Sequence, residues 1–245
     1  MRTLFALVLI PLLASLATVA MAATPACEAR SGERLTPVIE LYTSEGCSSC
    51  PPADQWLSTL KGKPVVAQAF HVGYWDYIGW VDRFANAAHT QRQREVAQTN
   101  HLSSIYTPQL VRNGQDWRDW HRSLTESTLP ARASIAVQRA ADGSVTAQVA
   151  PAAGVAHWSA YWTVTEDGHS SKVKAGENSG ELLQHDFVVR QYVPLGRYQG
   201  AQTLRLAAIA PTPGHAQHIN LVVSDAQTQA PLQALSLSCP LAAGS

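Results

Sequence analysis

The sequence predicts an α/β domain followed by a β-rich, sandwich-like domain. Between residues 36 and 130, short apolar runs alternate with stretches whose apolar residues recur at helical spacing. After Pro130 the apolar residues alternate with polar ones, which is the period of strands. A Cys-x-x-Cys motif also lies between the first predicted strand and the first predicted helix. We therefore expect one domain over residues 24–130 and a second over residues 131–245.

The elements of the first domain follow from local patterns. Ala53, Trp56, Leu57 and Leu60 have the i, i+3, i+4, i+7 spacing of an amphipathic helix, and the two prolines before them fit its first turn. The order of the expected strands and helices fits a right-handed βαβ unit joined to a ββ hairpin. In sequence, we expect a strand over 38–42, this helix, a strand over 64–71, a helix over 89–99, a strand over 109–112, a turn at 113–114 and a strand or helix through 117–120.

The second domain is expected to consist of short strands joined by turns. An Asp-Gly pair at 142–143 supplies a tight turn between the first two strands. Several short strands separated by turns are typical of a small antiparallel sandwich. The expected strands cover residues 134–139, 144–149, 160–165, 203–209, 219–223 and 235–239.

Composition excludes two broad classes of protein. The 245 residues include 18 Lys and Arg against 18 Asp and Glu, and 46% of them are hydrophobic while 15% are charged. Disordered chains combine low hydrophobicity with high charge, so a folded protein is expected. A nucleic-acid partner is not expected, because binding to phosphates needs a basic excess.

The N-terminal residues 1–23 have the pattern of a secretory signal peptide. Arg2 gives a positive start, residues 4–13 are an apolar run, and Ala20-Met21-Ala22 is a small-x-small cleavage pattern. The alternative is an uncleaved anchor, because the uncharged stretch is about one bilayer span long. No later segment is apolar enough to cross a membrane, so we expect a periplasmic or secreted protein with no stable membrane span after cleavage.

Four cysteines would enter an oxidising compartment: Cys27, Cys47, Cys50 and Cys239. They allow three pairings. Cys47 and Cys50 are close in sequence and are expected to pair, which leaves Cys27 and Cys239 for a second, structural disulfide. Such a bridge closes a long loop and would stabilise the fold by roughly 5 kcal/mol in the chain-entropy model.

The motif Cys47-Ser48-Ser49-Cys50 is the strongest chemical signal in the chain. It places Cys47 at a helix N-terminus, where unpaired N–H groups and the helix dipole stabilise a thiolate. Cys50 would lie one turn further on as the resolving thiol. Glu45 opposes thiolate formation if it is ionised and close. A structural disulfide and half of a metal site are the alternatives, although the chain has no second such motif.

Thr107 and Pro108 precede the third predicted strand. A proline at that place is either an ordinary strand-entry residue or a cis-proline turn. In a thioredoxin-like fold a cis-proline loop faces the Cys-x-x-Cys motif, and the residue before the proline pairs with an extended substrate. Thr107 would take that role.

An aromatic segment over residues 71–82 is a second candidate for the site. His71, Tyr74, Trp75 and Asp76 would wall a substrate groove, and His71 or Asp76 would assist proton transfer to the resolving cysteine. The alternative is that these residues pack in the core. His71 with the two cysteines of the motif is also a candidate three-ligand copper site.

Several motifs of the chain together resemble a bacterial exported family catalogued as domain of unknown function 1223. The resemblance implies a thioredoxin-like fold for the first domain and leaves the activity open. Gly46 and the Ser-Ser pair differ from thioredoxin itself, and Gly73 stands where the family pattern has an acidic residue. The motifs are ELYTSEGCSSCPPAD (40–54), HVGYWDY (71–77), YTPQ (106–109), NG (113–114), GEN (176–178), VVR (188–190) and LG (195–196).

These observations favour an exported thiol–disulfide oxidoreductase-like protein. Cys47 would exchange with a protein or small-molecule thiol or disulfide, Cys50 would resolve the mixed disulfide, and a redox partner protein would regenerate the pair. No cofactor and no resident metal are expected. The alternatives are a non-catalytic binding module with a structural disulfide, and a copper-handling protein that uses Cys47, Cys50 and His71.

Overall fold

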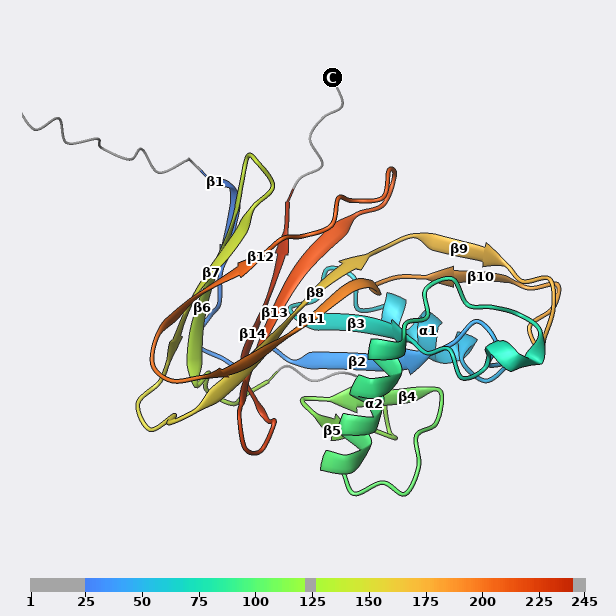
Figure 1. Ribbon diagram of the computed structural model, residues 1–245, viewed down its shortest axis with the longest axis horizontal. Helices are drawn as coiled ribbons and strands as arrows, with labels where there is room; N and C mark the ends of the chain where they lie inside the picture. Colours follow the sequence, from blue (N-terminus) through green and yellow to red (C-terminus); the bar gives the residue numbers. More distant parts are fainter. Residues whose placement is uncertain (1–24, 122–126, 240–245) are drawn as a thin grey trace, which may run out of the picture.

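A computed structural model describes residues 25–121 and 127–239 of the chain (Figure 1). The predicted signal peptide, residues 1–23, lies outside the described residues. Within these ranges the chain forms fourteen strands, two α-helices and one short 3-10 helix, η1 (Asp76–Ile78). The protein is therefore built mainly from β-sheet.

One eight-stranded sheet runs through both halves of the sequence. Its order is β14-β13-β8-β11-β3-β2-β4-β5. The strand β11 pairs in parallel with β3 on one side and antiparallel with β8 on the other, and so joins the two halves. The strands are β2 (Val38–Thr43), β3 (Val66–His71), β4 (Gln109–Arg112), β5 (Gln115–Asp116), β8 (Trp158–Glu166), β11 (Val188–Tyr198), β13 (Gln217–Asp225) and β14 (Pro231–Ser238).

A four-stranded sheet, in the order β1-β6-β7-β12, packs against the β8, β13 and β14 end of the large sheet. The largest apolar cluster lies here and includes Trp158 and Trp162, which are fully buried. The Cys27–Cys239 disulfide ties the first strand to the residue after the last one. The strands are β1 (Pro25–Arg30), β6 (Ala133–Ala140), β7 (Val145–Pro151) and β12 (Gln202–Leu206).

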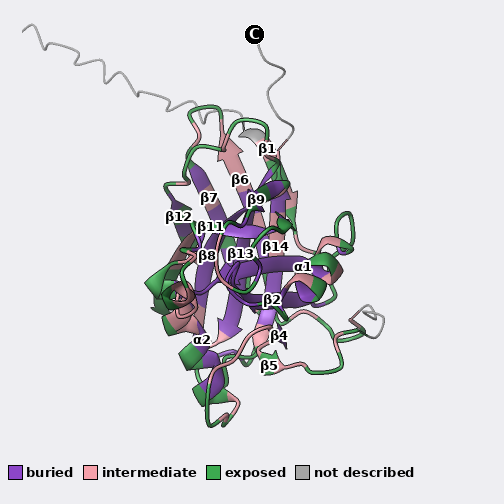
Figure 2. Ribbon diagram, turned by 90° about the vertical axis from the view of Figure 1, so that its right-hand side faces the viewer, coloured by how far each residue is buried: buried purple, intermediate pink, exposed green. Residues whose placement is uncertain are grey.

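The helices and a hairpin surround the parallel part of the large sheet. The helix α1 (Pro51–Ser58) connects β2 to β3, and α2 (Ala87–Thr99) precedes β4. All six residues of β2 and of β3 are buried, as expected for strands covered on both faces (Figure 2). The hairpin of β9 (His169–Lys172) and β10 (Leu182–His185) packs against α1. This arrangement brings residues near 180 to the ends of β2 and β3 (Figure 1).

The prediction of an α/β thioredoxin-like domain followed by a β-rich domain is wrong. Strands dominate the fold, and the β2-α1-β3 unit does not form a sheet of its own. The local elements near residues 38–43, 51–58, 66–71 and 87–99 do form where the sequence patterns place them. The error is one of long-range pairing: β11 adds to the edge of β3, so strands from both sides of residue 130 share one sheet.

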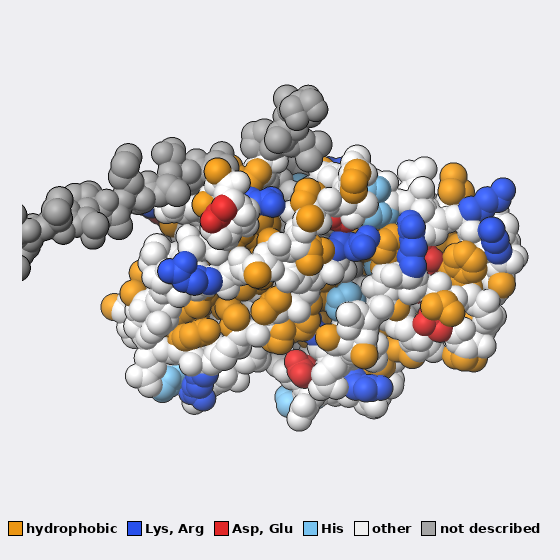
Figure 3. Space-filling view, turned by 45° about the horizontal axis from the view of Figure 1, so that its top comes forward, with side chains coloured by type: hydrophobic (Ala, Val, Ile, Leu, Met, Phe, Trp, Pro, Cys, Tyr) orange, Lys and Arg blue, Asp and Glu red, His pale blue; other side chains and the backbone are white. Residues whose placement is uncertain are grey.

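Charged and apolar side chains are interspersed on the surface (Figure 3). On the face drawn in Figure 3, Lys and Arg side chains are spread among apolar and uncharged ones. The described residues include exposed apolar side chains such as Tyr77, within η1, and Val81, shortly after it. In the described part of the chain, no helix combines the length and the apolar character needed to cross a bilayer.

Candidate functional site

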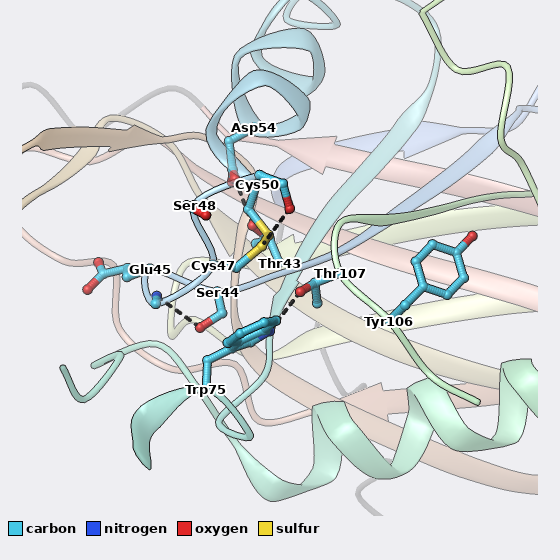
Figure 4. The surroundings of a disulfide bond; sticks show 12 residues. Thr43, Ser44, Glu45, Cys47, Ser48, Cys50, Asp54, Trp75, Tyr106 and Thr107 are labelled. Atoms are coloured by element: carbon cyan, nitrogen blue, oxygen red, sulfur yellow. Dashed lines mark hydrogen bonds between the residues drawn. A yellow bond between two sulfur atoms is a disulfide. The ribbon is translucent and has the colours of Figure 1, made fainter. Parts of the chain in front are cut away.

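The Cys47–Cys50 disulfide lies in the turn between β2 and α1 (Figure 4). The Cys47 N–H donates to the Ser44 carbonyl oxygen at 3.1 Å, and the Cys50 N–H donates to the Cys47 carbonyl oxygen at 3.1 Å. These two tight turns bring the Cα atoms of the cysteines to 5.4 Å. The pairing predicted for all four cysteines is thus present, with Cys27 bonded to Cys239.

The disulfide is at the N-terminus of α1. Cys50 is the N-cap residue, and its carbonyl oxygen accepts from the N–H groups of Ala53 and Asp54. Pro51 and Pro52 occupy the first helical positions, where a missing N–H costs little. The positive end of the helix dipole therefore lies beside the sulfur atoms and favours a thiolate. The carboxylate of Asp54, in the same turn, has the opposite effect.

Both sulfur-bearing residues are covered. Cys47 is 1% exposed and Cys50 is 0% exposed, whereas Ser48 and Ser49 between them are exposed. The backbone of the motif is therefore at the surface while its disulfide is not. Attack on either sulfur by an external thiol requires the residues around the disulfide to move.

The loop between β9 and β10 is hydrogen-bonded to the segment that carries the Cys-x-x-Cys motif. The side-chain amide of Asn178 donates to the carbonyl oxygens of Glu45 (2.9 Å) and Cys47 (3.1 Å). The Ser48 N–H donates to the carboxylate of Glu177 at 3.1 Å. These contacts join residues about 130 positions apart in sequence, and they give the Glu177-Asn178 motif a structural role at the disulfide.

Trp75 and Thr107 meet on another side of the motif. The indole N–H of Trp75 donates to the Thr107 hydroxyl oxygen at 2.7 Å, and Figure 4 shows this pair beneath the disulfide. The Thr107–Pro108 bond is cis. A Cβ atom on Gly46 would lie 2.9 Å from the Cβ of Trp75, so the tryptophan of thioredoxin has no room at that position. The predicted residues Trp75, Thr107 and Pro108 therefore do gather with the motif.

Tyr74 contacts the apolar core, and Asp76 contacts the loop that leads to Asp82. Tyr74 packs against the apolar cluster that contains Tyr42 and Phe70, and burial raises the pKa of its hydroxyl group. Asp76 accepts a hydrogen bond from the Asp82 N–H at 3.2 Å, and burial raises the pKa of its carboxyl group. Asp76 thus holds the loop that returns to Asp82.

His71, at the end of β3, is fully buried and is held by Asp82. Its Nδ1 atom lies 2.7 Å from an Asp82 carboxylate oxygen that also accepts the Glu45 N–H. Burial raises the pKa of Asp82, but the charge and hydrogen bond of His71 and two backbone N–H groups lower it to about 2. The carboxylate therefore stays ionised and fixes both the His71 ring and the segment before Cys47.

His185, at the end of β10, lies between two buried carboxylates. Its Nδ1 atom is 3.4 Å from Asp54 Oδ1, and its Nε2 atom is 3.5 Å from Glu45 Oε1. Burial lowers the pKa of His185, but these two carboxylates outweigh burial and raise it to about 9. Burial also raises the pKa of Glu45, but its interactions with His185, Ser171 and Trp80 leave that pKa lowered.

The sequence patterns did not identify this buried histidine. Asp54 is part of the first family motif, but His185 lies in a four-residue strand, LLQH, outside the motifs. The structure places His71 with Asp54 and His185, and their nearest ligand atoms all lie within 4.8 Å of one another. The cysteines that were candidates to share a copper ion with His71 are bonded to each other.

A pocket of about 640 Å³ opens beside the motif and extends to this cluster. It is lined by Ser48 and Pro51 at the motif, by Asp54 and His185 from the cluster, and by Glu177 from the β9–β10 loop. More of its lining is polar than apolar. The pocket therefore gives solutes a route to the region between the motif and the buried histidine.

The fold and the site together define a mainly β protein with a covered Cys-x-x-Cys disulfide at a helix N-terminus. Comparison with known families identifies the chain more closely. Residues 38–224 match the family described as "Protein of unknown function (DUF1223)", and the chain belongs to that family. No curated protein matches the sequence.

Two solved structures are similar to this chain. The crystal structure of protein AGR_C_4864 from Agrobacterium tumefaciens has a TM-score of 0.65 at 22% identity, over 88% of this chain and 99% of that one. The structure of HBP35 of Porphyromonas gingivalis has a TM-score of 0.55 at 12% identity, over 84% of this chain and 76% of that one. At these identities the likeness concerns the fold alone.

Proposed function

We propose that this protein is an exported thiol–disulfide exchange protein whose redox pair is Cys47 and Cys50. The observation that carries the proposal is the disulfide at the N-terminus of α1, with Trp75 and Thr107 on one side and an open pocket on the other. The helix N-terminus stabilises the thiolate that leaves when the disulfide is attacked.

The exchange proceeds in two balanced steps. A substrate thiolate attacks Cys47 Sγ, the Cys47–Cys50 bond breaks, and Cys50 leaves as a thiolate. A second substrate thiolate then attacks the mixed disulfide, and Cys47 is released. The substrate dithiol is oxidised to a disulfide, the protein is reduced to two thiols, and a disulfide of a redox partner restores it. The reverse sequence reduces a substrate disulfide.

Export follows from the sequence pattern of residues 1–23 and agrees with two disulfides in one small protein, since disulfides persist in oxidising compartments. N-terminal sequencing of the protein isolated from its source tests this part. A mature chain that begins close to residue 24 supports export, and a chain that retains residues 1–23 contradicts the predicted cleavage.

A structural disulfide in a binding module is the second candidate, and the burial of both cysteines favours it. A redox titration of the mature protein separates the two functions. Thiols are alkylated at each buffer potential, and each cysteine peptide is quantified by mass spectrometry. A Cys47–Cys50 potential between about −120 and −270 mV is typical of exchange catalysts, and a potential below about −300 mV is typical of structural bridges.

Cysteine variants test the roles of the two sulfur atoms. Cys47→Ser is expected to abolish exchange, and Cys50→Ser is expected to accumulate a mixed disulfide on Cys47. The matched control is the double variant Cys27→Ser with Cys239→Ser, which removes a disulfide distant in the fold and should leave exchange intact. Wild-type exchange rates in both motif variants would refute the proposed function.

A further inference from the structure

We infer that Asp54, His71 and His185 form a buried binding site for a divalent transition-metal ion, with Zn²⁺ as the best match. The three residues come from α1, the end of β3 and the end of β10. All three are buried, and in the described part of the chain they are the one group of metal-binding side chains whose ligand atoms converge within 4.8 Å. This inference goes beyond the proposed exchange function, because it uses neither cysteine.

Several buried polar atoms in this cluster lack hydrogen-bond partners. His71 Nε2 has none, although His71 is 0% exposed, and His185 Nε2 and Glu45 Oε1 make no hydrogen bond and face each other only as an ion pair at 3.5 Å. Buried polar groups are almost always satisfied, so such atoms call for an explanation. An unpartnered nitrogen of buried His71, beside His185 and the carboxylates of Asp54 and Glu45, is what a metal ion would satisfy when it displaces the proton of His185.

His71, Asp54 and Glu45 are each already held by a second polar atom, whereas Nδ1 of His185 lies 3.4 Å from Asp54 Oδ1. Nδ1 of His71 donates to the Asp82 carboxylate at 2.7 Å, so Nε2 is the ring nitrogen that remains for a metal ion. The Thr43 hydroxyl donates to Asp54 Oδ2 at 2.7 Å and leaves Oδ1 on the side of His185. The indole of Trp80 holds Glu45 Oε2 at 2.7 Å and leaves Oε1 free. A carboxylate on the far nitrogen of a ligating histidine is the usual support of a metal site.

The donor atoms select the class of metal. Two imidazole nitrogens and a carboxylate oxygen suit Zn²⁺ and its first-row neighbours better than Ca²⁺ or Mg²⁺, which prefer oxygen ligands. Tetrahedral zinc places its ligand atoms roughly 3.3 Å apart, so binding must draw the three side chains closer than 4.8 Å. Because Asp54 and His185 also line the pocket, a fourth ligand can enter from there, and Glu45, whose Oε1 lies 3.5 Å from His185 Nε2, is a protein group that can supply it.

The test uses the mature protein with both disulfides intact, stripped with a chelator and titrated with Zn²⁺ and Co²⁺. We expect one ion per chain, and a cobalt spectrum with ligand-field bands but no thiolate charge-transfer band. His71→Ala and His185→Ala should weaken binding by about 100-fold or more, and Asp82→Asn by about 10- to 100-fold through loss of the support on His71. His157→Ala removes a histidine whose ring contacts Gln199 on the surface and should bind as the wild type does.

In the titrations of the wild type and the histidine variants, two results would overturn the site. One is the absence of stoichiometric binding by the wild type, and the other is equal binding by the wild type and the histidine variants. Asp54→Asn keeps the size of the side chain, so it provides a folded variant if the alanine variants unfold, and unchanged affinity in it would also refute the site. Because the disulfides stay closed throughout, loss of metal binding is distinguishable from loss of thiol exchange.

Discussion

The hydrogen bonds of Asn178 should control how fast the Cys47–Cys50 disulfide is reduced. The side-chain amide of Asn178 donates to two carbonyl oxygens of the segment that carries Cys47, at 2.9 and 3.1 Å. Both cysteines are at most 1% exposed, so a thiol can attack only after this segment opens. Asn178→Ala removes both hydrogen bonds and leaves the disulfide itself unchanged.

The size of the effect follows from those two bonds. Each hydrogen bond contributes about 0.5–1.5 kcal/mol, so the opening becomes easier by about 1–3 kcal/mol. Since about 1.4 kcal/mol corresponds to a factor of ten, the open population should rise roughly 5- to 150-fold. The rate of reduction should rise by the same factor if opening is in fast equilibrium.

The assay is reduction of the mature protein by excess dithiothreitol, quenched by alkylation and read for each cysteine peptide. Asn100→Ala is a matched control, because the Asn100 amide also donates to two backbone carbonyl oxygens, those of Val96 and Gly114. It should leave the rate at the motif unchanged. An unchanged rate in Asn178→Ala, or an equal increase in both variants, would refute the proposal that the Asn178 hydrogen bonds control access to the disulfide.

Three further predictions concern stability. Arg92→Ala should lower the free energy of unfolding by about 3–5 kcal/mol in urea titrations. The reason is that Glu40 stays buried but loses its cationic partner, the Arg92 guanidinium, which now lies at 2.6 Å. A loss below about 1 kcal/mol would contradict this prediction. Replacing Cys27 and Cys239 by serine should cost about 5 kcal/mol by the same measurement, since the bridge spans 212 residues. Burial raises the pKa of Asp167, but hydrogen bonds and nearby cations lower it overall, so its ionised form stabilises the fold above the ordinary Asp pKa of about 3.9. This contribution should disappear as the pH falls below that value, and Asp167→Asn should show a weaker acid loss in denaturation curves taken from pH 6 down to about pH 2.

The sequence was informative about local elements and uninformative about which strands pair. The strand β11 shows why. It contains Pro194 and Gly196, residues that punctuate strands and so concealed it. In the structure its pairing with β8 shifts register between Pro194 and Arg197, and irregularities of this kind are where a strand tolerates proline. Because β11 was missed, its pairing with β3 was missed, and with it the single sheet that joins both halves.

The site shows the same division between local and distant information. Cys47, Cys50, Trp75 and Thr107 carry signals in their own short motifs, and they do lie together. His185 belongs to a four-residue strand, and the two carboxylates beside it are more than 100 positions away in sequence. Single-sequence patterns report neighbours along the chain, so a histidine placed by a distant hairpin leaves no trace in them.

The two proposed sites should be thermodynamically linked, because α1 belongs to both. Asp54, a proposed metal ligand, donates its N–H to the carbonyl oxygen of Cys50 at 3.2 Å. A bound dication adds positive charge near the sulfur atoms and favours a thiolate over the neutral disulfide, which raises the reduction potential. By reciprocity, reduction should tighten metal binding by the same factor. The potential of the Cys47–Cys50 pair is therefore expected to rise with Zn²⁺ in the wild type and to stay constant in His185→Ala. A rise that persists in His185→Ala would mean that the ion binds to the reduced cysteines instead, and no rise in either protein would mean that the two sites act independently.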